Sequence, residues 1–416
     1  MGEKNGQLGI VVGGGPAPGI NGVISAATIE ALNEGIKVIG IYDGFHWLAQ
    51  GDISHITDLT IKDVSRIHTT GGSILRTSRE NPAKNPEKLS RALDALQRLN
   101  IRYLLIIGGD DTCFTAARIA ETAQGVISVA HVPKTIDNDL PLPDNDVTFG
   151  FQSARHVGVT LVQSLMEDAK TTGRWYFIVT MGRQSGFLAL GIGKAAGATL
   201  TIIAEEFKEE HISLRHLCDI IEAAIIKRKS MGHDHGVLII SEGIGERLAP
   251  EELDGLESME RDEFDHPRLS ELDLGKVVKE EIKKRWAKRS HKVTIVEKDI
   301  GYELRSCPPI PFDCEYTRDL GYGAARFLLK GGTGALITLR GGNLEPIPFN
   351  KIIDSQTGKI RVRMVNTNTE SYQVALKYMI RLEREDLEDP ETLRGLAEIA
   401  SLSTEQFRQR FSYLVY

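Results

Sequence analysis

The stretch LGIVVGGGPAPGINGVISAATIEALNEG, residues 8–35, predicts a buried strand, a glycine-rich turn and a helix in that order. Residues 8–12 are a short, continuous apolar run, which is typical of a strand covered on both faces. Residues 21–33 repeat apolar side chains on one helical face, and Gly35 follows as a typical helix stop. The next strand is expected at residues 37–42. The stretch therefore indicates one strand–turn–helix–strand unit of an α/β fold.

The same alternation continues along the chain. Further strands are expected at residues 103–107, 126–132, 175–180, 201–204 and 236–241. A helix is expected at residues 214–228, with Ser213 as its cap. Strands that alternate with helices favour parallel sheets, because parallel neighbours need a crossover connection. We therefore predict an α/β fold of two doubly wound, mainly parallel-sheet domains, with the active site in the cleft between them.

Length and composition limit the classes of protein. At 416 residues the chain can form two domains of ordinary size, and its net charge of -7 argues against a broad basic surface for nucleic acid. The four cysteines include no C-x-x-C pair, which fits a reduced setting inside the cell. No apolar run reaches the roughly 18 residues that span a bilayer. We expect a cytoplasmic protein whose partners are neither nucleic acid nor membrane.

Polar clusters punctuated by glycine follow the predicted strands. They lie at residues 13–19, 108–112, 133–139, 181–186 and 242–243. Doubly wound sheets hold their ligands outside the carboxyl ends of the strands. One such cluster means little, but five together indicate a ligand-binding cleft.

Residues 13–19 form a glycine-rich turn that lets backbone N–H groups approach an anion, together with the N-terminus of the following helix. The two prolines in this turn distinguish it from the G-x-G-x-x-G dinucleotide fingerprint. The alternative is a glycine-rich turn that binds no ligand.

Asp110 and Asp111 are adjacent carboxylates at a strand end, where a cation must offset their charge. One of them is a natural ligand for Mg²⁺, which commonly takes one or two carboxylates plus substrate phosphates. The alternative is that both acids only cap a helix.

The run Lys134–Asp139 has the groups that phosphoryl transfer to an alcohol requires. Such a reaction needs an acceptor for the hydroxyl proton and cations on the migrating group. Asp137 can accept the proton, Lys134 is a fixed cation and Thr135 is a hydroxyl donor; the alternative is a polar turn with Asx caps. Three arginines near glycine-rich turns add positive charge suited to phosphate, namely Arg79, Arg174 and Arg183.

Other features give weaker signals. His233 and His235 lie in an expected loop without a third ligand at useful spacing, so a metal site there is disfavoured. Cys307 and Cys314 are expected to pack rather than to react. Residues 245–290 are strongly charged, and we expect an exposed, solvated helix there, with a partner surface as the alternative.

Six motifs occur in the order seen in 6-phosphofructokinases, and the chain resembles that family over roughly residues 8–345. They are Gly-Gly-Pro-Ala-Pro-Gly-Ile-Asn (14–21), Gly-Gly-Asp-Asp (108–111), Pro-Lys-Thr-Ile-Asp-Asn-Asp (133–139), Met-Gly-Arg (181–183), Ser-Glu-Gly (241–243) and Gly-Tyr-Glu-Leu-Arg (301–305). The ordered set is highly specific, so the resemblance implies roles for residues in each motif.

On the reacting groups, the resemblance implies that Asp137 is the catalytic base. It implies that Thr135 and Asp139 lie beside the transferring phosphoryl group. It also implies that Asp110 holds Mg²⁺, the expected cofactor.

On the sugar, the resemblance implies that fructose 6-phosphate is gripped by Met181, Gly182, Arg183 and Glu242. Tyr302 and Arg305 are similarly expected on the sugar and its 6-phosphate. Arg174 aligns with an arginine that, in relatives, reaches this phosphate across a subunit interface. A homodimer or homotetramer is therefore expected.

On the phosphate donor, the resemblance implies contacts from Gly15 and Arg79. ATP-using relatives usually have glycine at the two positions where this chain has Asp111 and Lys134, as pyrophosphate-dependent relatives do. Asp111 fills space that the α-phosphate of ATP needs, and it adds a negative charge facing an anion. Lys134 can stabilise the leaving phosphate. Both are expected to act with the catalytic base, and pyrophosphate is the expected donor.

The implied function is reversible phosphoryl transfer from pyrophosphate to the 1-hydroxyl of fructose 6-phosphate, giving fructose 1,6-bisphosphate and phosphate in glycolysis or gluconeogenesis. The alternatives are an ATP-dependent 6-phosphofructokinase, a non-catalytic regulatory subunit of the same fold, and a dinucleotide-binding oxidoreductase. Retention of Asp110, Lys134 and Asp137 disfavours the regulatory subunit, and the prolines of residues 13–19 disfavour the oxidoreductase.

The implied domains divide the chain by ligand. Residues 1–150, with about 306–345, are expected to bind the phosphate donor and Mg²⁺. Residues 151–305, which include the charged stretch 245–290, are expected to bind fructose 6-phosphate. Residues 346–416 are expected to contain strands and helices and have no assigned role.

Overall fold

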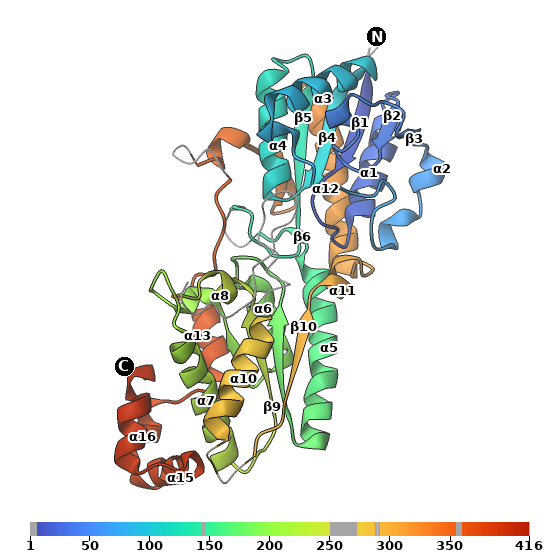
Figure 1. Cartoon of the computed structure of the whole chain (residues 1–416). Helices are drawn as coiled ribbons and strands as arrows, with labels where there is room; N and C mark the ends of the chain where they lie inside the picture. Colours follow the sequence, from blue (N-terminus) through green and yellow to red (C-terminus); the bar gives the residue numbers. More distant parts are fainter. Residues whose placement is uncertain are drawn as a thin grey trace. The chain divides into compact units, whose positions relative to one another are not determined.

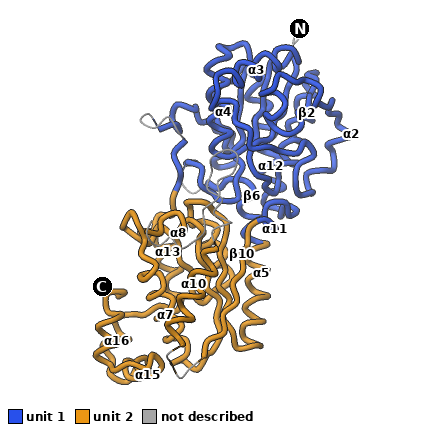
Figure 2. Tube along the Cα trace, viewed as in Figure 1, with its two compact units in different colours: residues 1–156, 302–363 blue, residues 157–301, 364–416 orange. Residues whose placement is uncertain are grey.

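The computed structural model describes residues 6–143, 146–249, 273–287, 289, 292–354 and 360–415. The chain divides into two compact units (Figure 2). Unit 1 comprises Met1–His156 and Tyr302–Arg363, and unit 2 comprises Val157–Gly301 and Met364–Tyr416. The C-terminal segment 346–416 is therefore split, because its first part belongs to unit 1 and the rest to unit 2.

Unit 1 is built around a sheet that has eight strands within the described residues (Figure 1). In spatial order the strands are β12 (Asn343–Pro348), β11 (Ala335–Arg340), β5 (Ser128–Thr135), β4 (Ile101–Gly108), β1 (Gln7–Val12), β2 (Val38–Ile41) and β3 (Ile56–Asp58), while β6 (Phe149–Gly150) pairs with β5. The inner pairings are parallel, whereas the edge strands β3 and β12 run antiparallel to their neighbours.

Helices cover both faces of this sheet. The helices of unit 1 are α1 (Ile20–Asn33), α2 (Ile61–Val64), α3 (Pro86–Arg98), α4 (Asp110–Thr122), α11 (Tyr302–Arg305) and α12 (Pro311–Leu329). α1 and α12 pack on the face that carries Leu8, Ile10 and Val12, and α3 and α4 pack on the face that carries Val11. Each face has its own apolar core, because successive side chains of a strand point to opposite faces.

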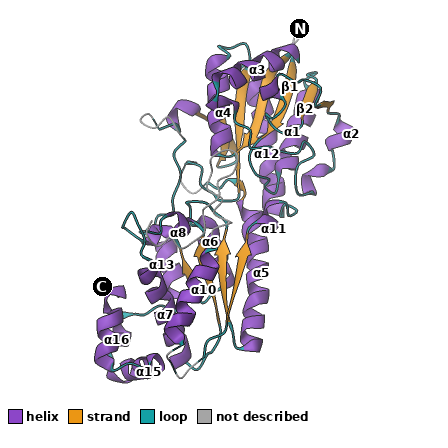
Figure 3. Ribbon diagram, viewed as in Figure 1, coloured by secondary structure: helices purple, strands orange, loops and turns teal. Residues whose placement is uncertain are grey.

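Unit 2 has a parallel sheet with four strands in the described part of the chain (Figure 3). In spatial order they are β10 (Ile295–Ile300), β7 (Trp175–Thr180), β9 (Gly236–Ser241) and β8 (Leu200–Ile202). Its helices are α6 (Phe187–Ala196), α7 (Leu214–Ser230), α8 (Gly243–Glu246), α10 (Leu274–Trp286), α13 (Glu370–Lys377), α14 (Arg384–Glu388), α15 (Pro390–Ala400) and α16 (Thr404–Phe411). Mainly parallel sheets flanked by helices in both units confirm the predicted α/β class.

Shorter features complete the path of the chain. Helix α5 (Phe151–Thr172) contains the boundary between the two sets of residues. Short 3₁₀ turns lie at Leu48–Gln50, Ile67–Thr69, Pro82–Lys84, Ala204–Glu206, Phe349–Lys351 and Ser412–Leu414. Ser213 precedes α7 as expected, but its side chain makes no capping hydrogen bond. Among the helices described, none is both long and apolar enough to cross a membrane.

The charged stretch 245–290 lies partly outside the described residues. Its described part includes α10, in which Leu274, Val278, Ile282 and Trp286 are at most 3% exposed and join the core of unit 2. Residues four apart share one face of a helix, so these side chains form a buried stripe. The expectation of an exposed, solvated helix is therefore wrong for α10.

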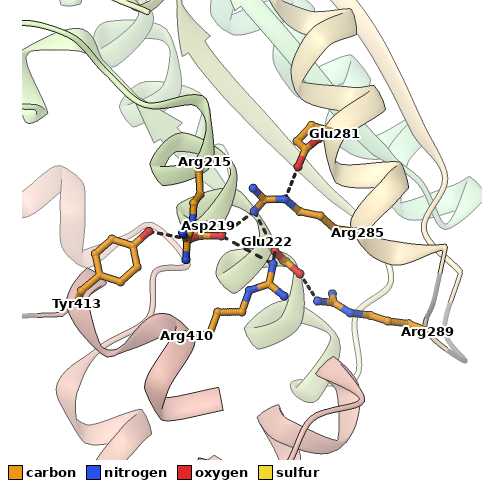
Figure 4. Close-up of polar contacts among 8 residues, drawn as sticks. All are labelled: Arg215, Asp219, Glu222, Glu281, Arg285, Arg289, Arg410 and Tyr413. Atoms are coloured by element: carbon orange, nitrogen blue, oxygen red, sulfur yellow. Dashed lines mark hydrogen bonds and ion pairs between the residues drawn. The ribbon is translucent and has the colours of Figure 1, made fainter. Parts of the chain in front are cut away.

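Two buried acids of α7 form a cluster of ion pairs in unit 2 (Figure 4). Asp219 and Glu222 are 1% and 0% exposed. Arg285 of α10 contacts Asp219 at 2.6 Å, and Arg410 of α16 contacts Glu222 at 2.6 Å. The Tyr413 hydroxyl donates to Asp219 at 2.7 Å. The cluster also includes Arg215, Glu281 and Arg289. It ties the C-terminal helical segment to α7 and α10.

Candidate active site

Three parallel strands of unit 1, β5, β4 and β1, are neighbours in the sheet and end at the same edge. In doubly wound sheets this carboxyl edge is where ligands bind. The predicted clusters at residues 13–19, 108–112 and 133–139 lie at the carboxyl ends of these three strands. The topology therefore brings together clusters that are far apart in the sequence.

The glycine turn after β1 is joined to the segment that contains Arg79. Gly13 pairs with Ser78 in an isolated bridge, and the Gly14 N–H donates to the Ser78 carbonyl at 2.7 Å. The Thr77 hydroxyl donates to the Gly14 carbonyl. Gly14 has a φ of 79°, a conformation that glycine adopts at little cost. Arg79 is exposed and lies one residue beyond this pairing.

Lys134, at the end of β5, brings a nearly buried cation to the same turn. It is 3% exposed, and its Nζ donates to the Gly15 carbonyl oxygen. A methyl group placed on Gly14 would lie 3.6 Å from that Nζ. Burial, and secondarily the charge of Lys134, lowers the pKa of His131 to about 3. The His131 imidazole is therefore neutral, and the ammonium is the positive charge at this strand end.

Arg305 of α11 approaches the glycine turn as well. A methyl group on Gly15 would lie 3.3 Å from the Arg305 Nη2. The Arg305 guanidinium lies over the Tyr302 ring at 5.1 Å, and Tyr302 itself is 66% exposed. The resemblance assigns both side chains to the sugar phosphate, and Arg305 lies beside the turn expected to hold the donor. Two cations thus flank Gly14 and Gly15, which suits a polyanionic ligand.

Asp110 and Asp111 occupy the first turn of α4 and are half-buried. Acids in the first turn also stabilise a helix by interacting with its dipole. This is the alternative role of the two residues, in which they bind no metal. The Thr115 hydroxyl and the Asn81 amide donate to the Asp111 carbonyl at 3.0 and 3.5 Å. Within the described residues, no three His, Cys, Asp or Glu side chains gather as a metal site. A Mg²⁺ ion that takes most of its ligands from phosphates and water needs only one or two carboxylates, so the donor set fits.

The turn after β5 carries the expected base. The Asp137 backbone N–H donates to the Thr135 hydroxyl oxygen at 3.0 Å. Asn138 has a φ of 58°, and its Oδ1 accepts from the Thr148 N–H at 3.1 Å. Asp137 and Asp139 are 9% and 6% exposed. The two carboxylates are therefore held on either side of a left-handed residue in a tightly bonded turn.

Arg363 contacts the turn that carries Asp137, and the sequence did not predict this contact. Its Nε and Nη2 donate to the Asn138 carbonyl at 3.0 and 2.9 Å, and its Nη1 donates to the Asp146 carbonyl at 2.7 Å. Burial lowers the pKa of the Arg363 guanidinium, and the charges of Asp139 and Asp146 oppose that shift. Nothing in the sequence near Arg363 signals this contact, because the residue follows the matched motifs by almost sixty positions.

In unit 2 the turns after β7 and β9 are bonded to each other. The Glu242 Oε1 accepts from the Gly182 N–H at 2.8 Å and from the Arg183 N–H at 2.6 Å. Arg183 has a φ of 51°, and the Met181 N–H donates to the Ile300 carbonyl at 3.0 Å. Four predicted sugar-binding residues are therefore neighbours, and Glu242 also has a structural role that the sequence did not reveal.

Arg174 is separated from this group. It precedes β7, whereas Met181 follows it, so the six-residue strand puts about 20 Å between them. The Arg174 Nε lies 3.9 Å from the Asp168 Oδ2. Within its own unit, Arg174 cannot reach a ligand bound at the Met181 turn.

Comparisons with known proteins agree with these features. A family model described as phosphofructokinase matches residues 7–328. The chain is 54% identical over 410 residues to pyrophosphate--fructose 6-phosphate 1-phosphotransferase from Thermotoga maritima, which covers 97% of this chain and 98% of the relative. It is 50% identical over 417 residues to the protein of the same name from Naegleria fowleri, covering 98% and 95%. At 28% identity over 366 residues it also resembles ATP-dependent 6-phosphofructokinase 3 from Bacteroides thetaiotaomicron, covering 86% and 94%.

Solved structures show the same fold. Pyrophosphate-dependent phosphofructokinase from Marinobacter aquaeolei matches with a TM-score of 0.67 at 16% identity, covering 95% of this chain and 92% of that one. Phosphofructokinase from Saccharomyces cerevisiae matches with a TM-score of 0.65 at 18% identity, covering 98% of this chain and 49% of that one. At these identities the likeness concerns the fold.

Proposed function

Since the chain belongs to the phosphofructokinase family, we propose that it transfers a phosphoryl group from pyrophosphate to the 1-hydroxyl of fructose 6-phosphate. The products are fructose 1,6-bisphosphate and orthophosphate, and the reaction runs in both directions. Two relatives that are 54% and 50% identical over nearly the whole chain carry the corresponding name. The observation that carries the donor assignment is the Lys134 ammonium, which is bonded to the glycine turn at Gly15.

The donor assignment has a steric and electrostatic basis. Asp111 is a carboxylate in the first turn of α4, where an α-phosphate with its nucleoside would add further negative charge and bulk. Pyrophosphate ends after two phosphates and has no such requirement. Orthophosphate as a leaving group lacks the many contacts of a nucleoside diphosphate, so it needs the nearby charge of Lys134.

The reaction has a defined proton and bond balance. The 1-hydroxyl oxygen of the sugar attacks the terminal phosphorus while the bond from that phosphorus to the bridging oxygen breaks. Asp137 accepts the hydroxyl proton, and orthophosphate leaves with the electron pair of the broken bond. Lys134 and Arg79 offset the charge that develops on the donor, and Thr135 and Asp139 lie beside the transferring group.

Asp110 is the proposed ligand of Mg²⁺. When bound, the ion would neutralise charge on the donor oxygens. Asp110 follows β4. The neighbouring strands β1 and β5 carry the glycine turn and Lys134 at their ends. Gly15 contributes backbone contacts to the donor phosphates.

Met181, Gly182, Arg183 and Glu242 of unit 2 are proposed to bind the sugar phosphate. Glu242 holds the Gly182 and Arg183 amides, which supports a preformed turn with Met181 at its start. Tyr302 and Arg305, which belong to unit 1, are also proposed to contact the sugar and its 6-phosphate. Arg174 is proposed to contribute from a second copy of the chain in a homodimer or homotetramer.

A two-donor assay tests the function. Initial rates are measured with fructose 6-phosphate and Mg²⁺, once with pyrophosphate and once with ATP, and then in reverse from fructose 1,6-bisphosphate and phosphate. Turnover with pyrophosphate in both directions is expected. Turnover with ATP alone would identify an ATP-dependent enzyme, and no turnover with either donor would identify a non-catalytic subunit.

A further inference from the structure

We propose that Arg363 is a positioning residue, which holds the Asn138 peptide so that the turn presents Asp137 in its reactive placement. The inference rests on the proposed function, because it takes Asp137 as the proton acceptor. Arg363 itself touches the turn and is not a catalytic residue. It lies beyond residues 7–328, the part of the chain that the family model matches.

The contacts of Arg363 converge on one peptide. Two of its guanidinium nitrogens, Nε and Nη2, donate to the Asn138 carbonyl at 3.0 and 2.9 Å. Nη2 also donates to the Asn138 Oδ1 at 2.5 Å. The Arg363 N–H donates to the Asp139 carbonyl at 2.6 Å. Backbone and side chain of one residue thus hold two successive carbonyls of the turn.

The conformation of Asn138 explains why this support matters. Its φ of 58° lies in the left-handed region, which most residues other than glycine adopt rarely, and which asparagine adopts where its side chain is hydrogen-bonded. The Asn138 side chain is 5% exposed and also accepts from the Thr148 N–H at 3.1 Å. A change in the Asn138 backbone angles would move Asp137 and Asp139, because these residues flank it directly.

The shape of arginine suits this task better than that of lysine. Its planar fork presents several N–H donors in a fixed arrangement, whereas an ammonium is a single point of charge. The third nitrogen, Nη1, donates to the Asp146 carbonyl at 2.7 Å, so the fork also ties the turn to the residues that follow it. The charges of Asp139 and Asp146 favour the protonated guanidinium.

The first arm of the test is kinetic. In Arg363→Ala, kcat with pyrophosphate should fall about 100-fold while KM for both substrates stays near its original value, since a displaced base impairs chemistry more than binding. Added guanidinium ion at millimolar concentration should restore part of kcat. Arg363→Lys should show most of the same decrease in kcat, because one ammonium group cannot replace the several donors of the guanidinium.

The matched control is Arg361→Ala. Arg361 is two residues away and exposed, and its Nη2 donates to the Lys351 carbonyl at 2.7 Å instead of to the turn. This variant should keep the original kcat. Asp137→Asn should lose activity that guanidinium does not restore.

The second arm needs no activity. Amide hydrogen exchange over residues 135–143 should be faster in Arg363→Ala than in the unchanged protein, and Arg361→Ala should match the unchanged protein. Unchanged exchange together with unchanged kcat would overturn the inference. A loss of kcat that guanidinium does not restore, with exchange accelerated throughout unit 1, would also overturn it in favour of a general structural role. An unchanged protein that fails to turn over pyrophosphate would count against the proposed function alone, and the exchange arm would still decide the role of Arg363.

Discussion

Lys134 is a nearly buried cation whose charge acts in two directions. On one side its Nζ donates to the Gly15 carbonyl of the glycine turn. On the other, its charge adds to the effect of burial and lowers the pKa of His131. A positive charge in this position suits an anionic ligand at the turn. It also disfavours protonation of the nearby His131 imidazole.

Removing Asp111 and Lys134, the side chains proposed to select the donor, should abolish turnover with pyrophosphate. In the double variant Asp111→Gly and Lys134→Gly, kcat with pyrophosphate should fall by at least about 100-fold, because a preorganised charge at the leaving group is lost. Steady-state rates with pyrophosphate and ATP measure this. The control is Lys37→Gly, which removes an exposed lysine. Undiminished pyrophosphate turnover in the double variant would refute the donor assignment.

The buried His131 should make stability depend on pH. Its pKa is about 3 in the folded protein and ordinarily about 6.5 in an unfolded chain. Because the folded pKa is lowered, the contribution is complete above about pH 6.5 and is lost as the pH falls toward 3. As the pH falls from about 6.5 toward 3, the free energy of unfolding should decrease with each pH unit. The decrease per pH unit should be about 1.4 kcal/mol larger in the unchanged protein than in His131→Gln.

Urea unfolding at several pH values checks this slope. His211→Gln, which changes an exposed histidine, should retain the steeper dependence. Equal slopes in the unchanged protein and in His131→Gln would contradict the expectation.

Strands and helices followed the local pattern where neighbours did not alter it. The strands at residues 175–180 and 236–241 begin and end where the apolar runs predict. β5 was expected to end at Val132, before the proline, yet it continues to Thr135. Pro133 pairs with Gly108 of β4, and Lys134 pairs with Phe149 of β6, so neighbouring strands extend it. A sequence pattern does not contain these partners.

The ion-pair cluster of α7 should be necessary for unit 2. Glu222 is fully buried and contacts Arg285, Arg289 and Arg410. Glu222→Ala should lower the free energy of unfolding by about 3–5 kcal/mol, because it leaves buried arginines without their acid. Urea denaturation measures the loss.

The matched control for this cluster is Glu280→Ala on α10. Glu280 contacts Lys283 at 3.2 Å and is exposed, so the change should cost at most about 1 kcal/mol. Equal losses in the two variants would show that burial of the cluster adds nothing to stability.

At the scale of the whole molecule, the C-terminal segment serves both units. Arg363 belongs to unit 1 and holds the turn that carries Asp137. Arg410 and Tyr413 belong to unit 2 and bind the buried acids of α7. Residues beyond 345, which had no assigned role in the sequence, thus support both halves of the chain.

Arg174 leads to a prediction about assembly. Because it lies at the opposite end of β7 from Met181, it can contribute to a sugar-phosphate site only from a second copy. Arg174→Ala and Asp137→Asn should each be nearly inactive alone. Co-expression of the two variants should restore up to ~25% of the original activity, because about half of the dimers are mixed and one of the two sites in each mixed dimer receives both intact residues.

Size-exclusion chromatography and activity of the co-expressed pair check this expectation. A protein that is monomeric and fully active would contradict it, and so would mixed dimers that stay inactive.

The sequence by itself determined the α/β class, the family and the residue types at the strand ends. These are local features, because glycine, aspartate and lysine directly after an apolar run indicate a polar strand end wherever the strand lies in the sheet. Tertiary structure alone decided the contacts of Lys134 with Gly15, of Glu242 with the Met181 turn, and of Arg363 with Asn138. Each joins residues far apart in the chain, and strand order and packing, which no single stretch encodes, bring them together.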